Sequence, residues 1–197
     1  MRRNLSIVES TLGPGSMLRR QGAGDSKNFL RFQRLSLIGL PNISSLEKQN
    51  LSLKKMAPDG LTPGPGTYIL ILQLENDQII QVGKLGLFRF PAGYYAYVGS
   101  AFGPGGLAGR LTHHLHPGKK LHWHIDYFRK NAVLVEILVR EDNRSLEHKW
   151  ASDLGQLDGA VVPVPGFGSS DCKCLTHLYY FQERPVLEAF QLGFHSH

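Results

Sequence analysis

Residues 66–100 read GTYILILQLENDQIIQVGKLGLFRFPAGYYAYVGS, and this stretch decides the fold because it holds four strand-like runs separated by turn residues. The residues from Thr67 to Leu74 are almost continuously apolar, which predicts a strand covered on both faces. Glu75-Asn76-Asp77 indicates a turn, and residues 78–82 are predicted to return as the second strand of a hairpin.

The second half of the stretch predicts another antiparallel strand pair. Its apolar runs are residues 87–90 and 94–98, and Pro91-Ala92-Gly93 is the turn between them. The beginning of the domain is therefore expected to be rich in antiparallel β-structure.

Helical periodicity begins after a glycine-rich connection at residues 102–106. Leu107, Leu111 and Leu115 recur every four residues, which predicts a helix with one buried stripe. The other expected elements are a helical segment at 122–130, a buried strand at 133–139, a third helix carrying Leu146, Trp150, Leu154 and Leu157, and an edge strand at 178–181. The expected fold class is α/β of the α+β kind, a small domain with a central, mainly antiparallel sheet flanked by helices.

The charge of +6 is unevenly distributed. Residues 1–60 hold ten Lys/Arg against four Asp/Glu, whereas residues 61–197 hold twelve of each. Within the neutral part, one stretch is nevertheless rich in cations: Lys84, Arg89, Arg110, Lys119, Lys120, Arg129 and Lys130. These side chains indicate either a local basic surface for nucleic acid or an ordinary solvated face.

Residues 1–60 lack a core-forming pattern apart from a weak apolar patch from Leu35 to Leu40. This predicts a basic, disordered extension. Its scarcity of acids also fits an organelle-targeting peptide, and Met56 is an alternative start. The domain is expected at residues 61–185, followed by a C-terminal tail at 186–197.

Hydropathy and cysteine usage bear on the compartment. No apolar run approaches the roughly 20 residues that a membrane-spanning helix needs, so no membrane partner is expected. Cys172 and Cys174 are one residue apart, too close for a routine disulfide, and no secretory signal is visible in residues 1–20. A reducing, cytoplasmic location is expected, with organelle targeting as the alternative.

Four residue types suit phosphodiester hydrolysis. Tyr68 and Tyr97 are predicted on strands that can be neighbours, where a tyrosine with a lowered pKa acts as a base. The alternative is a pair of sheet tyrosines with buried rings and wet hydroxyls. Arg110 and His114 are one helical turn apart, expected to point away from the leucine stripe, and suit phosphate binding or else a solvated face.

A carboxylate completes this set. Glu147 flanks the buried stripe of the third helix, where it can hold one divalent ion; the alternative is a first-turn acid favoured by the helix dipole. Glu136 and Asp126 remain alternative ligands.

The strings Gly66-Thr67-Tyr68 and Tyr97-Val98-Gly99, followed by Arg110 and His114, resemble the GIY-YIG nuclease superfamily. The chain is most similar to the branch of small proteins found alone or joined to endonuclease III domains, over residues 61–181. The resemblance implies an active centre of Tyr68, Tyr97, Arg110, His114 and Glu147, in which Glu147 holds one Mg²⁺ or Mn²⁺. In this chain Thr67 and Val98 replace the two isoleucines, the loop before Arg110 is longer, and the late asparagine has only His177 as a stand-in.

The expected function is therefore that of a metal-dependent endonuclease cutting branched or damaged DNA in repair or recombination. Arg110 clamps the phosphate, Glu147 holds the metal, Tyr68 is the base, and Tyr97 and His114 assist. A non-catalytic nucleic-acid-binding module is the first alternative.

A zinc-stabilised interaction domain is the second alternative. Cys172, Cys174 and His177, with His122 and His124, offer zinc ligands. The C-x-C spacing is tighter than in common zinc knuckles, so loop-packing cysteines and surface histidines remain the competing interpretation. The sequence assigns no role to the Trp123-His124-Ile125-Asp126 string.

Overall fold

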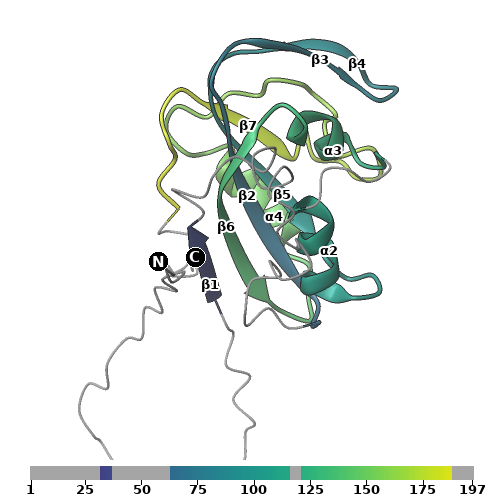
Figure 1. Cartoon of the computed structure of the whole chain (residues 1–197). Coiled ribbons are helices and arrows are strands. Elements are labelled where there is room, and N and C mark those ends of the chain that lie inside the picture. Colours follow the sequence, from purple (N-terminus) through teal and green to yellow (C-terminus); the bar gives the residue numbers. More distant parts are fainter. Residues whose placement is uncertain (1–31, 37–62, 116–120, 188–197) are drawn as a thin grey trace, which may run out of the picture.

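The computed structural model describes residues 32–36, 63–115 and 121–187 (Figure 1). The helices and strands in these ranges are β1 (Phe32–Ser36), β2 (Gly66–Leu74), β3 (Gln78–Val82), β4 (Gly86–Phe90), β5 (Gly93–Ser100), α2 (Gly106–Leu115), α3 (His124–Arg129), β6 (Val133–Glu141), α4 (Glu147–Leu154) and β7 (Leu178–Phe181). The bounds agree closely with the predicted segments from residue 66 onward.

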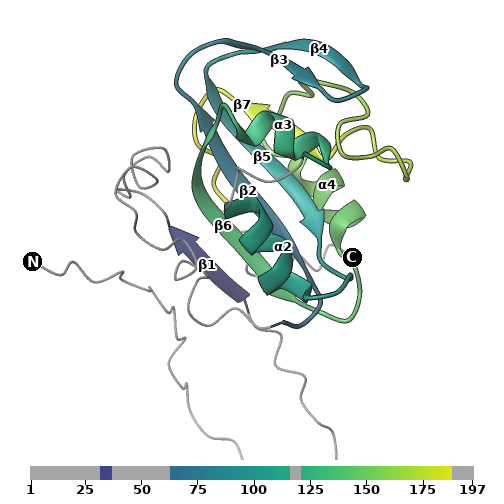
Figure 2. The ribbon, with the colours of Figure 1, turned by 45° about the vertical axis from the view of Figure 1, so that its right-hand side comes forward.

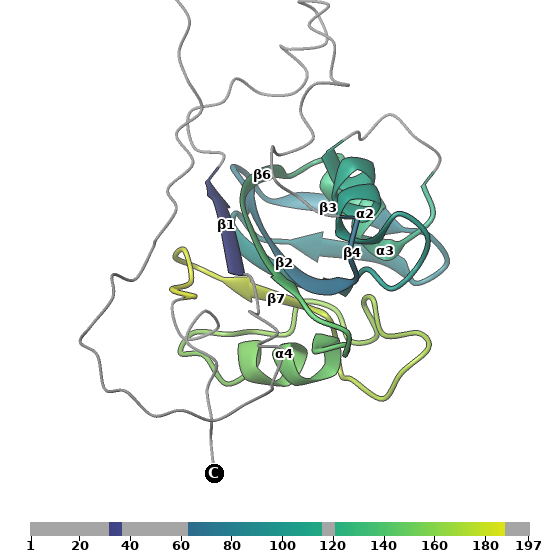
Figure 3. The same ribbon diagram turned by 90° about the horizontal axis from the view of Figure 1, so that it is seen from below.

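One five-stranded sheet organises the domain, with the strand order β1-β6-β2-β5-β7. Every pairing within it is antiparallel, and β3 and β4 form a separate two-stranded sheet. Helices α2 and α3 cover one face and α4 covers the other (Figure 3). The predicted α+β fold with a mainly antiparallel sheet is confirmed, and β7 is the predicted edge strand.

The predicted hairpin pairings are wrong, although the strand positions are right. β2 pairs with β5, not with β3, and β3 pairs with β4, so that one hairpin is nested inside another. The reason is the tight turn after β3, where Gly83 adopts a φ of 48° that favours glycine. The Glu75-Asn76-Asp77 turn does not reverse the chain onto β2. It begins an arm that leaves the main sheet (Figure 2).

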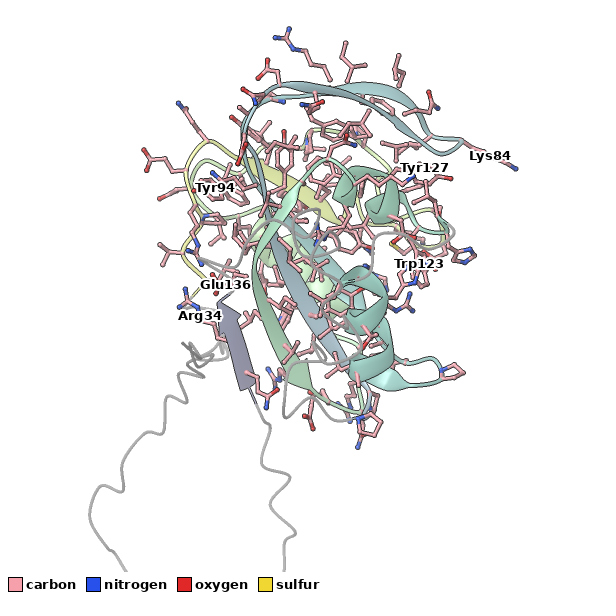
Figure 4. All side chains as sticks on the ribbon, in the orientation of Figure 1. Arg34, Lys84, Tyr94, Trp123, Tyr127 and Glu136 are labelled. Atoms are coloured by element: carbon pink, nitrogen blue, oxygen red, sulfur yellow. The ribbon has the colours of Figure 1, made fainter. Side chains whose placement is uncertain are left out.

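Asp77 fixes the base of this arm, the β3–β4 hairpin. Its carboxylate accepts hydrogen bonds from the backbone N–H of Ala92 at 2.9 Å and from Arg89 at 2.7 Å. The arm therefore lies over α3, with Ile80 and Phe90 buried in the core beneath it. Lys84, at the tip of the arm, points away from the domain (Figure 4).

Alternation along β2 divides the buried side chains between two cores. Tyr68, Leu70 and Leu72 face α2 and α3, whereas Ile69 and Ile71 face α4. This two-sided burial explains the nearly continuous apolar run. None of the helices in the three described ranges is long and apolar enough to cross a bilayer.

Five residues of the segment expected to lie outside the domain nevertheless form β1, which pairs with β6 at the sheet edge. Arg34 of β1 forms an ion pair with the buried Glu136 (Figure 4). Arg184 binds the same carboxylate. Burial of an acid between two guanidinium groups is how such a charge is tolerated. The remainder of residues 1–60, apart from this strand, lies outside the described residues, as do residues 188–197 of the predicted tail.

Candidate active site

Strand pairing places the two tyrosines on one face. Tyr68 lies opposite Gly99 and Tyr97 lies opposite Leu70 in the β2–β5 ladder, so the two rings are diagonal neighbours in the core under α2 and α3. A side chain at Gly99 would collide with the Tyr68 hydroxyl. The absence of a side chain at Gly99, in the Tyr97-Val98-Gly99 string, therefore leaves room for that hydroxyl.

His114 is the direct partner of Tyr68. The Tyr68 hydroxyl lies 2.7 Å from His114 Nε2, and each residue is only 2% exposed. The expectation that His114 points away from the leucine stripe is wrong, because it is buried beside Leu111 and Leu115. Burial lowers the pKa of His114 to about 3, so the ring is neutral at physiological pH.

The protonation states follow from this burial. Burial raises the pKa of Tyr68 well above its ordinary value, so the hydroxyl keeps its proton. Because the Asp126 Oδ1 atom lies 3.9 Å from His114 Nδ1, we assign the ring proton to Nδ1, which leaves Nε2 to accept the hydrogen bond from the Tyr68 hydroxyl. Tyr68, His114 and Asp126 form what we call the tyrosine–histidine cluster.

The Trp123-His124-Ile125-Asp126 string supplies Asp126 to this cluster and packs beside it. Asp126 accepts hydrogen bonds from the backbone N–H groups of His122 and Trp123, each at 2.9 Å, which fixes the start of α3. His124 Nδ1 accepts from the N–H of Gly168 at 3.0 Å, and Ile125 is a core residue.

Arg110 lies over the indole ring of Trp123, with its guanidinium carbon 4.0 Å from the ring centroid. This contact holds a half-buried cation on the α2 side of the sheet. Burial is the largest effect on the pKa of both Tyr68 and Tyr97 and raises it, and the positive charge of Arg110 opposes this rise at both residues. The guanidinium therefore acts on both hydroxyl groups.

Glu147 reaches the site from the opposite face. Its helix, α4, covers the other side of the sheet, but Glu147 is its first residue and lies at the end of β5. Its carboxylate accepts from the Ser100 hydroxyl at 2.6 Å and lies 3.4 Å from His177 Nδ1. Burial alone would raise the pKa of Glu147, but His177 and Ser100 lower it overall, so the carboxylate is ionised at neutral pH.

The five predicted site residues are thus brought together from both faces. Besides burial, the dominant cause, the negative charge of Glu147 raises the pKa of both Tyr68 and Tyr97, an effect that requires proximity. The arrangement offers a protonated tyrosine with a neutral histidine as its acceptor, one cation and one carboxylate. Glu136, an alternative metal ligand, is committed to Arg34 and Arg184 instead.

The predicted basic surface is only partly formed. Arg129 is 5% exposed and donates to the carbonyl oxygen of Ala132 at 2.6 Å, so it is a core residue. Arg89 is paired with Asp77 on the arm, whereas Lys84 and Lys130 are exposed. Lys119 and Lys120 lie outside the described residues.

A second cluster includes His177, the histidine that lies beside Glu147. Cys172, Cys174 and His177 come together with His148 of α4, and we call these four residues the Cys/His cluster. His122 and His124, considered as further zinc ligands, do not belong to it. Both cysteines are free thiols.

Sequence reasoning missed four contributors: the pairing role of Asp126, Arg110's support by Trp123, the Ser100 hydroxyl on Glu147, and His148 in the Cys/His cluster. Two carried a usable signal, because Ser100 directly follows the Tyr97-Val98-Gly99 string and His148 directly follows Glu147.

Comparison with known families places most of the domain in a described family. A family model described as "Domain of unknown function DUF123" matches residues 67–196, more than half of the chain. No curated protein and no solved structure matches the chain.

Proposed function

We propose that this chain, which belongs to the family described as Domain of unknown function DUF123, is a metal-dependent endonuclease that hydrolyses phosphodiester bonds in DNA. The observation that carries the proposal is the 2.7 Å contact between the buried Tyr68 hydroxyl and the neutral His114, next to Arg110 and the ionised Glu147. The resemblance of the two tyrosine strings to the GIY-YIG nucleases supports the same activity.

Water activation uses Tyr68 and His114 together. Tyr68 is protonated, so it accepts a proton from the attacking water only as its own proton passes to His114 Nε2, 2.7 Å away. Asp126, whose carboxylate lies near Nδ1, stabilises the imidazolium that results. Its negative charge is the largest of the effects that raise the His114 pKa, and it opposes burial, which lowers that pKa. The hydroxide then attacks phosphorus.

Arg110 stabilises the charge that develops on the phosphoryl oxygens. Its fork of N–H groups matches phosphate geometry, and its stacking on Trp123 limits its motion before substrate binds. Tyr97, whose hydroxyl experiences both Arg110 and Glu147, orients the phosphate or the attacking water.

The donor set fits one hard divalent ion. Glu147 contributes a single carboxylate with a serine hydroxyl beside it, and an ionised carboxylate keeps acceptor capacity beyond its two contacts. Mg²⁺ and Mn²⁺ are commonly held by one or two carboxylates, with water and phosphate oxygens completing the shell. When bound, the ion would supply Lewis-acid stabilisation of the leaving oxygen.

The test is a nicking assay with the purified full chain on supercoiled plasmid and on a four-way junction. We expect cleavage when Mg²⁺ or Mn²⁺ is added and none when Ca²⁺ replaces it. Tyr68→Phe and Glu147→Gln should each abolish cutting, whereas Glu183→Gln, which changes an exposed acid, should cut like the wild type.

Binding without cutting on both substrates would overturn the enzymatic proposal and favour a non-catalytic DNA-binding module. Branched DNA cut in preference to plasmid would identify the substrate as a junction and place the protein in repair or recombination.

A further inference from the structure

Three separate parts of the chain bring four potential ligand atoms to one point. His148 comes from the first turn of α4, Cys172 and Cys174 from the loop that follows residue 166, and His177 from the residue before β7. The cluster therefore ties this loop to α4 on the face of the sheet opposite α2.

The distances within the cluster match a tetrahedral metal site. The four ligand atoms all lie within 4.8 Å of one another, with His148 Nδ1 3.3 Å from Cys174 Sγ and Cys172 Sγ 3.4 Å from His177 Nε2. A tetrahedral ion with metal–nitrogen bonds of about 2.1 Å and metal–sulfur bonds of about 2.3 Å places such atoms roughly 3.5 Å apart. Small side-chain rotations bring all four atoms to that spacing.

We propose that His148, Cys172, Cys174 and His177 bind one zinc ion. Two thiolates and two imidazoles are a soft donor set that suits Zn²⁺ and excludes Mg²⁺ as the preferred ion, since Mg²⁺ requires oxygen ligands. Four protein ligands fill a tetrahedral shell, so the ion is structural and has no open position for substrate. The site is distinct from the divalent ion at Glu147.

The zinc site also reaches the candidate active site through one imidazole. His177 is 2% exposed; its Nε2 faces Cys172 and its Nδ1 lies 3.4 Å from Glu147 Oε1. A histidine that binds metal through one nitrogen commonly presents the other N–H to a carboxylate. Zinc therefore fixes the His177 tautomer with its proton on Nδ1, and this N–H orients the Glu147 carboxylate. The role of this orientation in catalysis rests on the proposed nuclease function.

Gly168 connects the same loop to Tyr97. A Cβ atom at Gly168 would lie 3.0 Å from both the Tyr97 ring and His177 Cβ, and the glycine has a φ of 74°. Tyr97, Gly168 and His177 are therefore packed in contact, so loop movement on zinc loss reaches the tyrosine directly.

The experiment measures metal content in the full chain purified under reducing conditions without added chelator. We expect about one zinc per chain by elemental analysis, and exchange for Co²⁺ should give the visible absorption of tetrahedral cobalt with thiolate ligands. Returning Zn²⁺ to metal-free protein at about a hundredfold excess over its dissociation constant should raise the melting temperature by roughly 5–10 °C.

Two exposed histidines form a matched pair of variants. His148→Gln should bind zinc at least tenfold more weakly and Cys172→Ser should lose it, whereas His122→Gln should retain full stoichiometry. Zinc should also protect both thiols of the wild type from alkylation, a readout that does not depend on the variants folding. Equal zinc affinity in His148→Gln and wild type, or thiols alkylated at the same rate with and without Zn²⁺, would overturn the proposal, and neither result depends on DNA cleavage.

Discussion

The tyrosine–histidine cluster and the Cys/His cluster both lie close to Glu147 but differ in how their polar atoms are satisfied. In the first, the Tyr68 hydroxyl donates to His114, and Asp126 accepts two backbone N–H groups, all within a buried region. In the second, the ligand atoms of two thiols and two imidazoles face one another, and His148 is exposed. In the first, His114 Nδ1 has no hydrogen-bond partner among the residues that the structure describes and is faced by the Asp126 carboxylate at 3.9 Å, whereas in the second all four ligand atoms converge on one point that a cation would occupy.

This difference distinguishes two roles, proton transfer and metal binding, that residue types alone do not separate, because histidine suits both. In the proposed mechanism, the neutral hydrogen-bonded pair relays a proton, and its burial disfavours charge on either residue before substrate binds. A cluster of facing ligand atoms holds an ion and fixes a loop. Glu147 is the residue shared by both, through its own carboxylate and through His177.

The largest effect should come from removing the charged groups beside the tyrosine–histidine cluster. Glu147→Gln and Arg110→Ala should each reduce DNA cleavage at least about a hundredfold, because each removes an oriented group that stabilises developing charge. Their binding should differ. Without metal, Glu147→Gln should bind DNA as tightly as the wild type or slightly more tightly, because the repulsion between carboxylate and phosphate is removed. Arg110→Ala should bind more weakly, and the salt dependence of its affinity should correspond to about one phosphate contact fewer.

Cleavage rates and affinities measured on one oligonucleotide over a range of salt concentrations check this prediction. Equal cutting by wild type and Glu147→Gln would reject Glu147 as the metal ligand and leave it only the role of supporting His177.

Acid should break the tyrosine–histidine cluster through His114. Its pKa is about 3 in the folded chain and 6.5 in the unfolded chain, so the unfolded state binds the proton first. The contribution of the neutral His114 to the free energy of unfolding is therefore fully present above about pH 6.5. It falls by about 1.4 kcal/mol per pH unit as the pH is lowered toward 3. Chemical denaturation at pH 7, 6 and 5 measures this slope.

The His114→Gln variant is the control, because zinc release in acid affects it and the wild type equally. Its free energy of unfolding should fall less steeply with pH. An identical slope in both proteins would mean that His114 is protonated in the fold and is no neutral acceptor for Tyr68.

A smaller effect is expected from Tyr68→Phe. The substitution leaves His114 Nε2 buried without its donor, which should lower the free energy of unfolding by about 1–3 kcal/mol. Tyr94→Phe, on the half-buried side chain that packs against the α4 core, should change it by less than about 0.5 kcal/mol. Urea denaturation of the three proteins measures the difference, and equal losses in both variants would show that the Tyr68–His114 bond contributes no special stability.

The strands, helices and most candidate residues were predictable because each depends on local pattern. The leucine spacing of α2 and the apolar run of β2 are signals of this kind. Strand pairing was not predictable, since it depended on the turn at Gly83 and on Asp77 reaching Ala92 across fifteen residues. The burial of His114 and the placement of His148 beside Cys174 are likewise tertiary facts, with no periodicity in the sequence to announce them.

Strand β1 gives the N-terminal extension a consequence for self-association. A chain begun at Met56 would lack β1, so β6 would become an outer strand with unpaired backbone groups from Glu136 to Arg140, and the buried Glu136 would keep only Arg184. A long open strand edge is a template for pairing with another chain. We expect the shorter product to associate at high concentration while the full chain does not, as light scattering would measure, so that the length of the extension decides the colloidal behaviour of the domain.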